Sequence, residues 1–304
     1  MTDTPDTDQT RCGFIALVGA PNAGKSTLLN SLVGTKVSIV THKAQTTRAM
    51  IRGVVTEGSG QVVFIDTPGI FKPRRRLDRA MVEAAWTGAG DADFVALIVD
   101  AERGATDEVE ALIDGLRDVP HPKILVLNKI DLLKREKLLA LAEELNARLT
   151  FERTFMISAL NGDGVKDFLG FCLERIPLGP WHFPEDQLTD LTLALTAAEV
   201  TREKLFLRIH EEIPYNAHVE TEKFTVNKDG SYRIDQVIYV TRPTHKKIVL
   251  GAGGQTIKAI GAEARKELME IFEVPVHLFL FVKVREKWGE DPERYREMGL
   301  QWTK

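Results

Sequence analysis

The chain has 304 residues, of which 43% are hydrophobic and 28% are charged, and its net charge is −4 at pH 7. This length allows two ordinary domains, each with its own core, and the small negative charge gives no general indication of nucleic-acid binding. The longest apolar runs last about half a dozen residues, against the roughly 20 that a membrane-spanning helix needs, so no such helix is expected. The two cysteines, Cys12 and Cys172, form no C-x-x-C pair, which indicates a reduced, cytoplasmic setting.

The polar and acidic residues 1–12 predict a disordered extension rather than a signal peptide. From residue 13 to residue 176, short β-rich runs alternate with segments of helical spacing. This alternation predicts a doubly wound, mostly parallel α/β sheet that binds ligands at the carboxyl ends of its strands. The expected strands are 14–18, 62–65, 94–99, 124–127 and 155–158, and the expected helices include 107–117, 136–149 and 165–175.

The first expected strand is followed by G-A-P-N-A-G-K-S, which opens a helix. This spacing between a strand and a helix is typical of a P-loop, whose backbone N–H groups surround the phosphates of a nucleotide. Lys25 is expected to bind the β- and γ-phosphates, and the Ser26 hydroxyl is expected to bind Mg²⁺. The expected nucleotide contacts in this loop are Gly19, Pro21, Asn22, Ala23, Gly24, Lys25, Ser26 and Thr27.

Two segments after the P-loop are expected to complete the Mg²⁺ and γ-phosphate site. The polar loop H-K-A-Q-T-T-R offers a threonine that can close over Mg²⁺, with Thr47 as the preferred candidate and Thr46 as the alternative. D-T-P-G ends the second expected strand, which places Asp66 to hold Mg²⁺ through water and the Gly69 N–H to reach the γ-phosphate. Ser26, Thr47 and Asp66 therefore form the expected metal site.

The candidate catalytic residues are Lys25, Thr47 and Gly69. Ras-like enzymes carry, directly after the D-x-x-G glycine, a glutamine that orients the attacking water. Here that position is Ile70, whose side chain can neither orient water nor accept a proton. Unaided hydrolysis is therefore expected to be slow.

The motif N-K-I-D after the strand at 124–127 predicts guanine recognition. Asp131 can accept hydrogen bonds from guanine N1 and N2, whereas adenine offers no matching donors. Asn128 is expected to brace the P-loop, and the stem of Lys129 to lie along the base. A backbone N–H in the tripeptide after the next strand can reach guanine O6. The expected base site is Asn128, Lys129, Asp131, Ser158, Ala159 and Leu160.

Three prolines and a glycine lie within residues 177–184 and predict a linker, taken as residues 177–187. The remainder, residues 188–304, is expected to form a second, small α+β domain. A long helix is expected over 188–210, followed by two strands that flank N-K-D-G, a helix after G-A-G-G, and a last strand over 276–284.

The G-A-G-G sequence precedes a helix, and a GxxG loop in that place clamps about four nucleotides of single-stranded RNA. Six cations and one acid lie between Arg242 and Lys266, although on charge alone a solvated helix face is the simpler interpretation. Val249, Ile260 and their apolar neighbours are expected to form a floor for bases or to pack the helix. The candidate RNA-binding residues are Lys246, Lys247, Ile248, Leu250, Gly251, Ala252, Gly253, Gly254, Ile257 and Lys258.

Together these motifs resemble the Era family of bacterial GTPases over nearly the whole chain. The more specific marks are Q-T-T-R at 45–48, P-E-D-Q-L-T-D at 184–190, H-E-E-I-P-Y-N at 210–216 and G-A-G-G-Q-T-I-K-A-I-G at 251–261. The resemblance implies a P-loop GTPase domain and a type II KH domain that binds the 3′ end of 16S ribosomal RNA. It further implies a GTP/GDP switch with Mg²⁺ in 30S ribosomal subunit assembly.

The same resemblance implies K⁺-assisted hydrolysis through Asn22 and a cytoplasmic protein with peripheral association with the inner membrane; a monomer is expected. Asn22 also fits a purely structural role in its loop. Ala252 stands where the family usually has a lysine, which removes one phosphate contact. Two other interpretations stay open: an RNA-binding ribosome factor that is only stabilised by nucleotide, which Ile70 favours, and a P-loop ATPase, against which Asp131 argues.

Overall fold

The computed structural model describes residues 10–43, 46–209 and 213–302. The chain forms two compact units. The first comprises Met1–Ser38, Thr47–Asp190 and Met298–Lys304, and the second comprises Ile39–Thr46 and Leu191–Glu297. Among the described residues, no helix combines the length and the apolar character needed to cross a bilayer.

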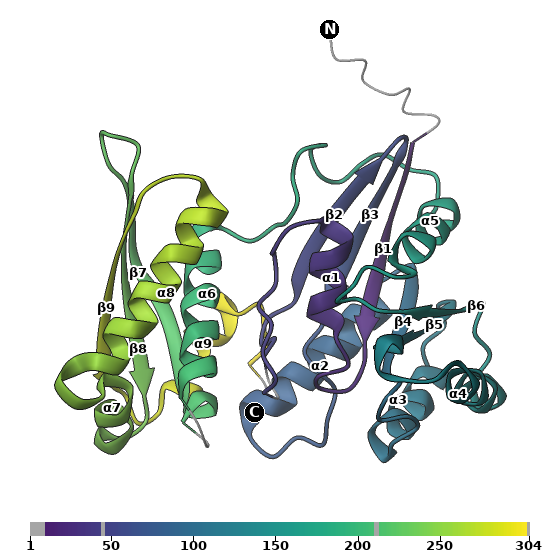
Figure 1. Cartoon of the computed structure of the whole chain (residues 1–304), viewed down its shortest axis with the longest axis horizontal. Helices are drawn as coiled ribbons and strands as arrows, with labels where there is room; N and C mark the ends of the chain where they lie inside the picture. The colour runs from purple at the N-terminus through teal and green to yellow at the C-terminus, as the bar shows by residue number, and fades with distance from the viewer. Residues whose placement is uncertain (1–9, 44–45, 210–212, 303–304) are drawn as a thin grey trace, which may run out of the picture. The chain divides into compact units, whose positions relative to one another are not determined.

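The first unit is built on a six-stranded sheet with the strand order β2-β3-β1-β4-β5-β6 (Figure 1). Neighbouring strands are parallel except for β2 and β3, which form an antiparallel hairpin. This confirms the expected doubly wound, mostly parallel sheet. The strands are β1 (Arg11–Val18), β2 (Ile51–Glu57), β3 (Gly60–Asp66), β4 (Phe94–Asp100), β5 (Lys123–Asn128) and β6 (Arg153–Ile157).

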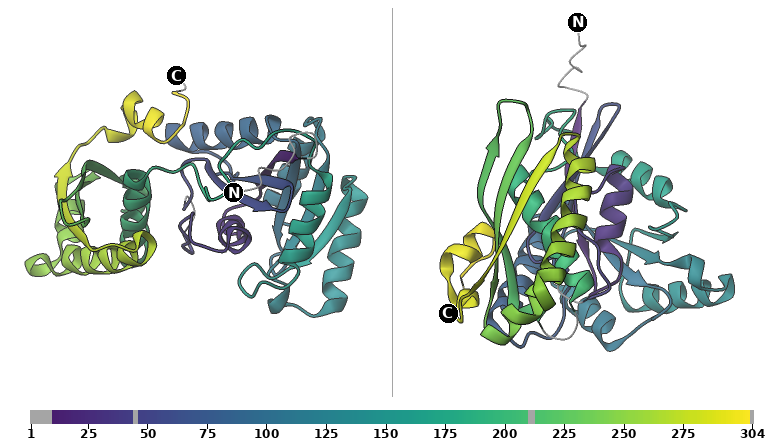
Figure 2. Two further views of the ribbon diagram at one scale, coloured as in Figure 1. Left: turned by 90° about the horizontal axis from the view of Figure 1, so that it is seen from above. Right: turned by 60° about the vertical axis from the view of Figure 1, so that its left-hand side comes forward.

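Helices cover both faces of this sheet (Figure 2). On one face lie α1 (Lys25–Val33) and α5 (Val165–Arg175), which pack together and against β3. The other face carries α2 (Arg76–Gly90), α3 (Asp107–Arg117) and α4 (Arg135–Arg148), whose apolar residues share one buried core with β4 and β5. The expected motifs directly follow β1, β3, β5 and β6, so they meet at the carboxyl edge of the sheet.

The N-terminal strand starts earlier than the sequence indicates. Residues 1–9 of the expected extension lie outside the described residues, but Arg11 and Cys12 belong to β1. The Arg11 guanidinium donates a 2.8 Å hydrogen bond to the carbonyl of Ile176, and the Cys12 N–H donates one of 3.1 Å to that of Pro177. These two residues are therefore ordered by the chain that leaves α5, which lies far away in the sequence.

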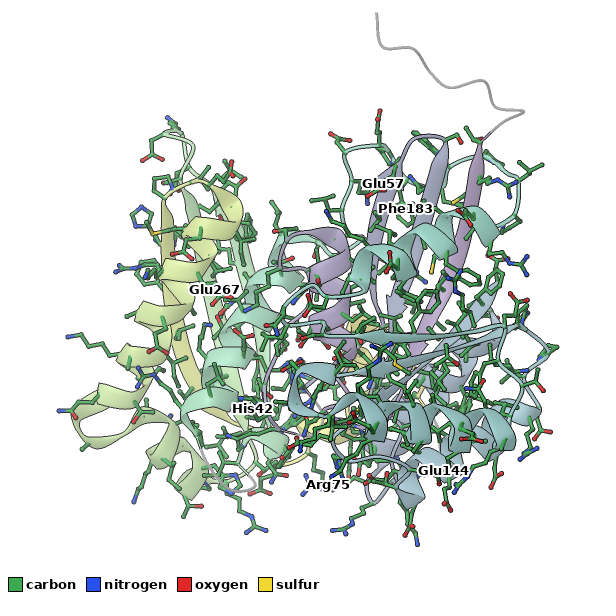
Figure 3. All side chains as sticks on the ribbon, turned by 45° about the vertical axis from the view of Figure 1, so that its right-hand side comes forward. His42, Glu57, Arg75, Glu144, Phe183 and Glu267 are labelled. Atoms are coloured by element: carbon green, nitrogen blue, oxygen red, sulfur yellow. The ribbon has the colours of Figure 1, made fainter. Side chains whose placement is uncertain are left out.

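The proline-rich segment after α5 runs beside the β2–β3 hairpin. The backbone N–H groups of His182 and Phe183 each donate a 3.0 Å hydrogen bond to Oε1 of Gln61. The Gln61 amide in turn donates a 2.8 Å hydrogen bond to the Phe183 carbonyl. Figure 3 labels Phe183 close to Glu57, at the end of β2. Hydrogen bonds to the buried side chain of Gln61 therefore hold the segment expected as a linker against the first unit.

The helix that follows is shorter than the range expected from its spacing. Residues 188–190 continue along β2, where the Val54 N–H donates to the Leu188 carbonyl at 2.9 Å and Arg52 pairs with Asp190 at 2.6 Å. Helix α6 then spans Leu193–Arg208, and the Thr192 side chain accepts the N–H of Leu195 as its N-cap. Pairing with a sheet edge therefore replaces the first turns of the expected helix.

The second unit contains a three-stranded sheet in the order β7-β8-β9 (Figure 1). Strand β7 (Ala217–Val226) is antiparallel to β8 (Tyr232–Val240), which is parallel to β9 (Val276–Val284). The helices are α6, α7 (Pro243–Leu250), α8 (Gln255–Phe272) and the short α9 (Pro292–Glu297). The order helix, strand, strand, two helices and strand is the small α+β topology expected for the second domain.

Candidate nucleotide site and GxxG loop

The P-loop turns sharply between β1 and α1. Asn22 and Gly24 adopt the left-handed region, with φ of 64° and 97°. A Cβ atom on Gly24 would lie 2.1 Å from Nδ2 of Asn128, so no larger residue fits there. The expected contacts are brought together: Gly19, Pro21, Asn22, Ala23 and Gly24 lie in the loop, and Lys25, Ser26 and Thr27 in the first turn of α1.

The ammonium group of Lys25 is buried inside this loop. It donates hydrogen bonds to the carbonyl oxygens of Gly19 at 3.0 Å and Ala20 at 3.1 Å. Burial lowers the pKa of Lys25 to about 8, and the neighbouring Asp66 only partly opposes this shift. A desolvated cation of this kind is strongly stabilised by an anion, so the geometry fits a bound phosphate group.

A carboxylate and hydroxyl groups converge at the end of β3. Oδ2 of Asp66 accepts hydrogen bonds from the hydroxyls of Ser26 at 2.6 Å, Ser38 at 2.9 Å and Thr47 at 3.2 Å. The hydroxyl oxygens of Ser26 and Thr47 are 2.9 Å apart. Oδ1 of Asp66 is buried without a hydrogen-bond partner among the described residues. These hard oxygen atoms and the uncompensated carboxylate oxygen fit Mg²⁺.

Burial raises the pKa of Asp66, against the opposing effects of Lys25 and of the three hydroxyl hydrogen bonds. A divalent cation would favour the ionised carboxylate, in the same way that phosphate would favour protonated Lys25. Ser38 is a member of this cluster that the sequence reasoning missed. Its hydroxyl reaches Asp66 from 28 residues away, and no local motif marks it.

The two candidate threonines have different surroundings. The Thr46 hydroxyl lies 2.6 Å from that of Thr41 and donates to the carbonyl of Lys43 at 2.7 Å, away from Asp66. The Thr47 hydroxyl faces Ser26 and Asp66 and is buried. This geometry favours Thr47 as the residue that reaches a metal ion.

The segment after D-T-P-G approaches the P-loop closely. A Cβ atom on Gly69 would lie 3.0 Å from the Cα atom of Pro21, and the Ile70 N–H donates a 3.2 Å hydrogen bond to the Gly19 carbonyl. The Ile70 side chain packs against the apolar core shared by β4, β5, α3 and α4. It therefore supplies no polar atom beside the phosphates.

The side-chain amide of Asn128 connects three parts of the site. Its Nδ2 donates a 2.9 Å hydrogen bond to the Ala23 carbonyl of the P-loop, and its Oδ1 accepts one of 2.9 Å from the Ala159 N–H. Ser158 is fully buried beside Ala159, and Leu160 is 80% exposed. The tripeptide after β6 is thus tied to the guanine motif, as expected for residues that line a base.

Lys129 and Asp131 of the guanine motif are less buried than Asn128. Lys129 has a left-handed φ of 66°, and its ammonium group pairs with Oδ2 of Asp100 at 2.5 Å. Asp131 lies in a short 3₁₀ turn, Ile130–Leu132, and its carboxylate is exposed. Asp100 ends β4 beside β5 and was not expected from the sequence. It orients the lysine stem, and Asp131 is accessible to a base.

The GxxG loop links α7 to α8 in the second unit. Gly251, Gly253 and Gly254 have φ of 74°, 58° and 79°. A Cβ atom on Gly251 would lie 2.2 Å from the hydroxyl oxygen of Thr256, whereas one on Gly253 or Gly254 would meet no atom within 4 Å. The inner end of the loop is therefore tightly packed, and its outer side, with the exposed Ala252, is open for a ligand backbone.

The apolar residues around this loop divide into two groups. Val249 and Ile260 are fully buried in the core of the second unit, so for these two residues the packing alternative holds. Ile248 is 49% exposed, and Leu250 and Ile257 are partly buried at the edge of that core. Of these five apolar residues, Ile248, Leu250 and Ile257 remain accessible to bases.

The cations near the loop are available for phosphate groups. Lys247 and Lys258 are exposed and Lys246 is half-buried, and none of the three forms an ion pair within the described ranges. Glu263, the single acid in this stretch, pairs with Arg208 of α6. The positive charge around the GxxG loop is thus not neutralised from within the described part of the chain.

Comparison with known proteins identifies the family. A model of the 50S ribosome-binding GTPase family matches residues 14–129, and a KH domain model matches residues 212–289. GTPase Era of Rhizobium meliloti (strain 1021) is 62% identical over 309 residues, which cover 100% of this chain and 99% of that protein. GTPase Era of Brucella suis biovar 1 is 62% identical over 294 residues, with 97% and 94% coverage.

Solved structures agree with this assignment. A crystal structure of Era in complex with MgGDPNP and nucleotides 1506-1542 of 16S ribosomal RNA aligns with a TM-score of 0.91 and 37% identity, over 96% of this chain and 99% of that one. An Aquifex aeolicus Era variant bound to GDP.AlF4⁻ aligns with a TM-score of 0.89 and 37% identity, over 95% and 99%. The chain therefore belongs to the Era family and is a GTP hydrolase with a P-loop GTPase domain and a KH domain.

Proposed function

We propose that this protein is a nucleotide switch in 30S ribosomal subunit assembly, which hydrolyses GTP slowly and binds the 3′ end of 16S ribosomal RNA. The observation that supports this most is the Era crystal structure with MgGDPNP and nucleotides 1506-1542 of 16S ribosomal RNA, which matches 96% of this chain. The open GxxG loop, and nearby lysines that form no ion pair with other described residues, agree with an RNA ligand. Membership of the Era family removes the ATPase alternative.

In this proposal the phosphates lie in the P-loop. Lys25 carries the charge that faces the β- and γ-phosphates, and the Gly69 N–H faces the γ-phosphate. Ser26, Thr47 and Asp66 hold Mg²⁺, which when bound neutralises negative charge on the phosphates. The base is read by Asp131 and lined by Asn128, Lys129, Ser158, Ala159 and Leu160.

Slow hydrolysis follows from the surroundings of the γ-phosphate. The partly buried Ile70 side chain packs against the core, so no polar group at that position orients the attacking water. The proposed catalytic groups, Lys25, Thr47 and the Gly69 N–H, stabilise charge or position the phosphate. A monovalent cation held by Asn22, which has a left-handed φ of 64° in the P-loop, would add positive charge there, and K⁺ is the proposed ion.

RNA is proposed to bind across the GxxG loop. Its backbone follows Gly251–Gly254, which present no side chain larger than that of Ala252. Phosphates approach Lys246, Lys247 and Lys258, and bases contact Ile248, Leu250 and Ile257. The 30S subunit is the proposed partner of a monomeric protein. Peripheral association with the inner membrane stays an expectation from the family resemblance.

The test is a titration of the full-length protein with an RNA of nucleotides 1506-1542 in the presence of a non-hydrolysable GTP analogue. A variant with Ala252→Asp and Gly253→Asp places two negative charges where phosphates must approach. RNA affinity should fall at least about tenfold, because phosphate contacts dominate such binding. Affinity for the GTP analogue should not change, since these residues lie in the second unit.

A control variant carries Ala140→Asp and Ala147→Asp, which add the same charge at exposed positions of α4 in the first unit. It corrects for the change in net charge. If the GxxG variant binds the RNA as tightly as this control, the loop is not the RNA clamp and the proposed RNA site is wrong.

A further inference from the structure

The turn after helix α1 brings Ser38 back to the end of β3. Helix α1 ends at Val33, and Gly34 follows it with a left-handed φ of 79°. Beyond this turn, the Ser38 hydroxyl donates a 2.9 Å hydrogen bond to Oδ2 of Asp66. Ser38 is 1% exposed and Asp66 is fully buried, and both residues belong to the first unit. Ser38 is therefore a buried neighbour of the proposed Mg²⁺ site.

The side-chain amide of Asn30 fixes the backbone of Ser38. Oδ1 of Asn30 accepts hydrogen bonds of 2.9 Å from the N–H groups of Val37 and Ser38. Nδ2 of Asn30 donates a hydrogen bond of 2.7 Å to the carbonyl oxygen of Ser38. An amide carries both a donor and an acceptor on one planar group, so it can bind both kinds of backbone group at once. One side chain of α1 thus holds both backbone polar groups of Ser38.

The two carboxylate oxygens of Asp66 have different surroundings. Oδ2 accepts hydrogen bonds from the hydroxyls of Ser26, Ser38 and Thr47, at 2.6, 2.9 and 3.2 Å. Oδ1 is buried and has no hydrogen-bond partner within the described ranges. Each oxygen of an ionised carboxylate has about two lone-pair sites, so the three hydroxyls fully occupy Oδ2. They hold the carboxylate in one orientation and leave Oδ1 available for a water molecule on Mg²⁺.

The three hydroxyl groups around Oδ2 are held in different ways. Ser26 and Thr47 are proposed ligands of Mg²⁺, so their oxygens serve both the ion and Asp66. Ser38 is not a proposed ligand, and the hydrogen bonds of Asn30 hold it without any contribution from a bound molecule. Among the described residues, Ser38 is therefore the hydroxyl donor whose only task at this site is to orient Asp66.

We propose that Ser38 and Asn30 are positioning residues of the Mg²⁺ site: Asn30 fixes Ser38, and the Ser38 hydroxyl holds the Asp66 carboxylate in the orientation that binds the metal. This inference rests on the proposed role of Asp66. Neither residue acts on the nucleotide or on the ion itself. Replacing a residue that orients a metal ligand commonly lowers metal affinity by about tenfold to a hundredfold.

The experiment uses the full-length protein with Ser38→Ala, which removes one buried oxygen atom. Mn²⁺ serves as the probe, because its electron paramagnetic resonance signal distinguishes free from bound ion. The measurements are the Mn²⁺ dissociation constant of the complex with a non-hydrolysable GTP analogue, and the affinity for that analogue in EDTA. Ser38→Ala should raise the Mn²⁺ dissociation constant about tenfold. Analogue affinity in EDTA should stay within about twofold, because Ser38 acts only through Asp66.

Two further variants test the role of Asn30. Asn30→Ala should raise the Mn²⁺ dissociation constant several-fold, since it leaves Ser38 without the amide that fixes it. Combining Asn30→Ala with Ser38→Ala should weaken Mn²⁺ binding little beyond the effect of Ser38→Ala alone, because Asn30 acts through Ser38. If the two losses multiply in the double variant, Asn30 does not act through Ser38 and this part of the inference is wrong.

The matched control is Ser31→Ala. Ser31 is the next residue of α1, is half-buried, and forms no hydrogen bond with Asp66 in the described part of the chain, so Mn²⁺ affinity should not change. Asp66→Asn is the reference for losing the carboxylate. If Asp66→Asn weakens Mn²⁺ binding but Ser38→Ala behaves like Ser31→Ala, the positioning inference is wrong and the proposed metal site stands.

Two other outcomes also overturn the inference. If Ser38→Ala weakens analogue binding in EDTA as much as it weakens Mn²⁺ binding, Ser38 only supports the fold of the phosphate site. If Asp66→Asn leaves Mn²⁺ binding unchanged, the proposed role of Asp66 fails, and the positioning inference fails with it.

Discussion

The side-chain amide of Asn128 donates a 2.9 Å hydrogen bond to the carbonyl oxygen of Ala23, and so ties the guanine motif to the P-loop. The two residues are 105 positions apart, but they meet because β1 and β5 end at the same edge of the sheet. The same amide accepts the Ala159 N–H. The phosphate-binding and base-binding halves of the site are therefore held in one geometry.

Asn128→Ala should weaken all nucleotides alike. It leaves the Ala23 carbonyl and the Ala159 N–H buried without these partners, which should lower the free energy of unfolding by about 1–3 kcal/mol. Urea denaturation measures this change, and titrations with GDP and xanthosine diphosphate measure the affinities. If the Asn128→Ala variant unfolds at the same urea concentration as the wild-type protein, the amide does not brace the site.

Asp131→Asn should instead change which base is preferred. GTP affinity should fall about tenfold to a hundredfold, because an amide cannot accept both guanine N–H groups as a carboxylate does. Xanthosine triphosphate should bind more tightly, since the new amide donor faces the xanthine O2. The control is Asp118→Asn, at the exposed end of α3. Equal preference in both variants would mean that Asp131 does not read the base.

GDP binding should weaken as the pH rises above about 8. Burial lowers the pKa of Lys25 to about 8, and a bound phosphate favours the charged ammonium. Where Lys25 is neutral, GDP binding requires the uptake of a proton. GDP affinity is therefore close to its maximum well below pH 8 and falls steadily as the pH rises above about 8. From pH 7 to 8.5 it should fall about fourfold. Lys25→Met should bind more weakly with a flat profile, and an equal fall in that variant would assign the effect to another group.

Turnover should depend on the monovalent cation. Replacing Na⁺ by K⁺ should raise the rate of phosphate release roughly tenfold, which corresponds to about 1.4 kcal/mol of transition-state stabilisation. Asn22→Ala should abolish this gain. Ile70→Ala should change the rate little, because the isoleucine packs against the core and performs no chemistry. Equal rates in both salts would remove the cation from the mechanism.

Elements with strong local signals were predicted from the sequence nearly to the residue. The expected ranges 107–117, 165–175 and 276–284 coincide with α3, α5 and β9. Clear start signals explain this for the helices: the Thr106 side chain caps α3, and Gly164 precedes α5 with a left-handed φ of 70°. The P-loop, D-T-P-G and N-K-I-D residues also meet, since β1, β3 and β5 are parallel strands that end at the same edge of the sheet.

What the sequence could not predict depends on contacts between distant residues. Ser38 reaches Asp66, and Asp100 pairs with Lys129, without any motif that marks Ser38 or Asp100. Strand β2 carries few apolar residues in a row and is formed by pairing with β3. The hydrogen bond that the Val40 N–H donates to Oε1 of Glu203 spans 163 positions. Hydrophobic periodicity reports which face of an element is buried, but not which distant group covers it.

The central claim is that nucleotide and RNA binding are coupled. It is tested most directly by titrating the RNA of nucleotides 1506-1542 against the protein loaded with GDP or with a non-hydrolysable GTP analogue. The account predicts tighter RNA binding in the GTP state, and linkage then requires RNA to tighten binding of the GTP analogue relative to GDP by the same factor. Identical RNA affinities in the two nucleotide states would contradict the account, because the two activities would then be independent.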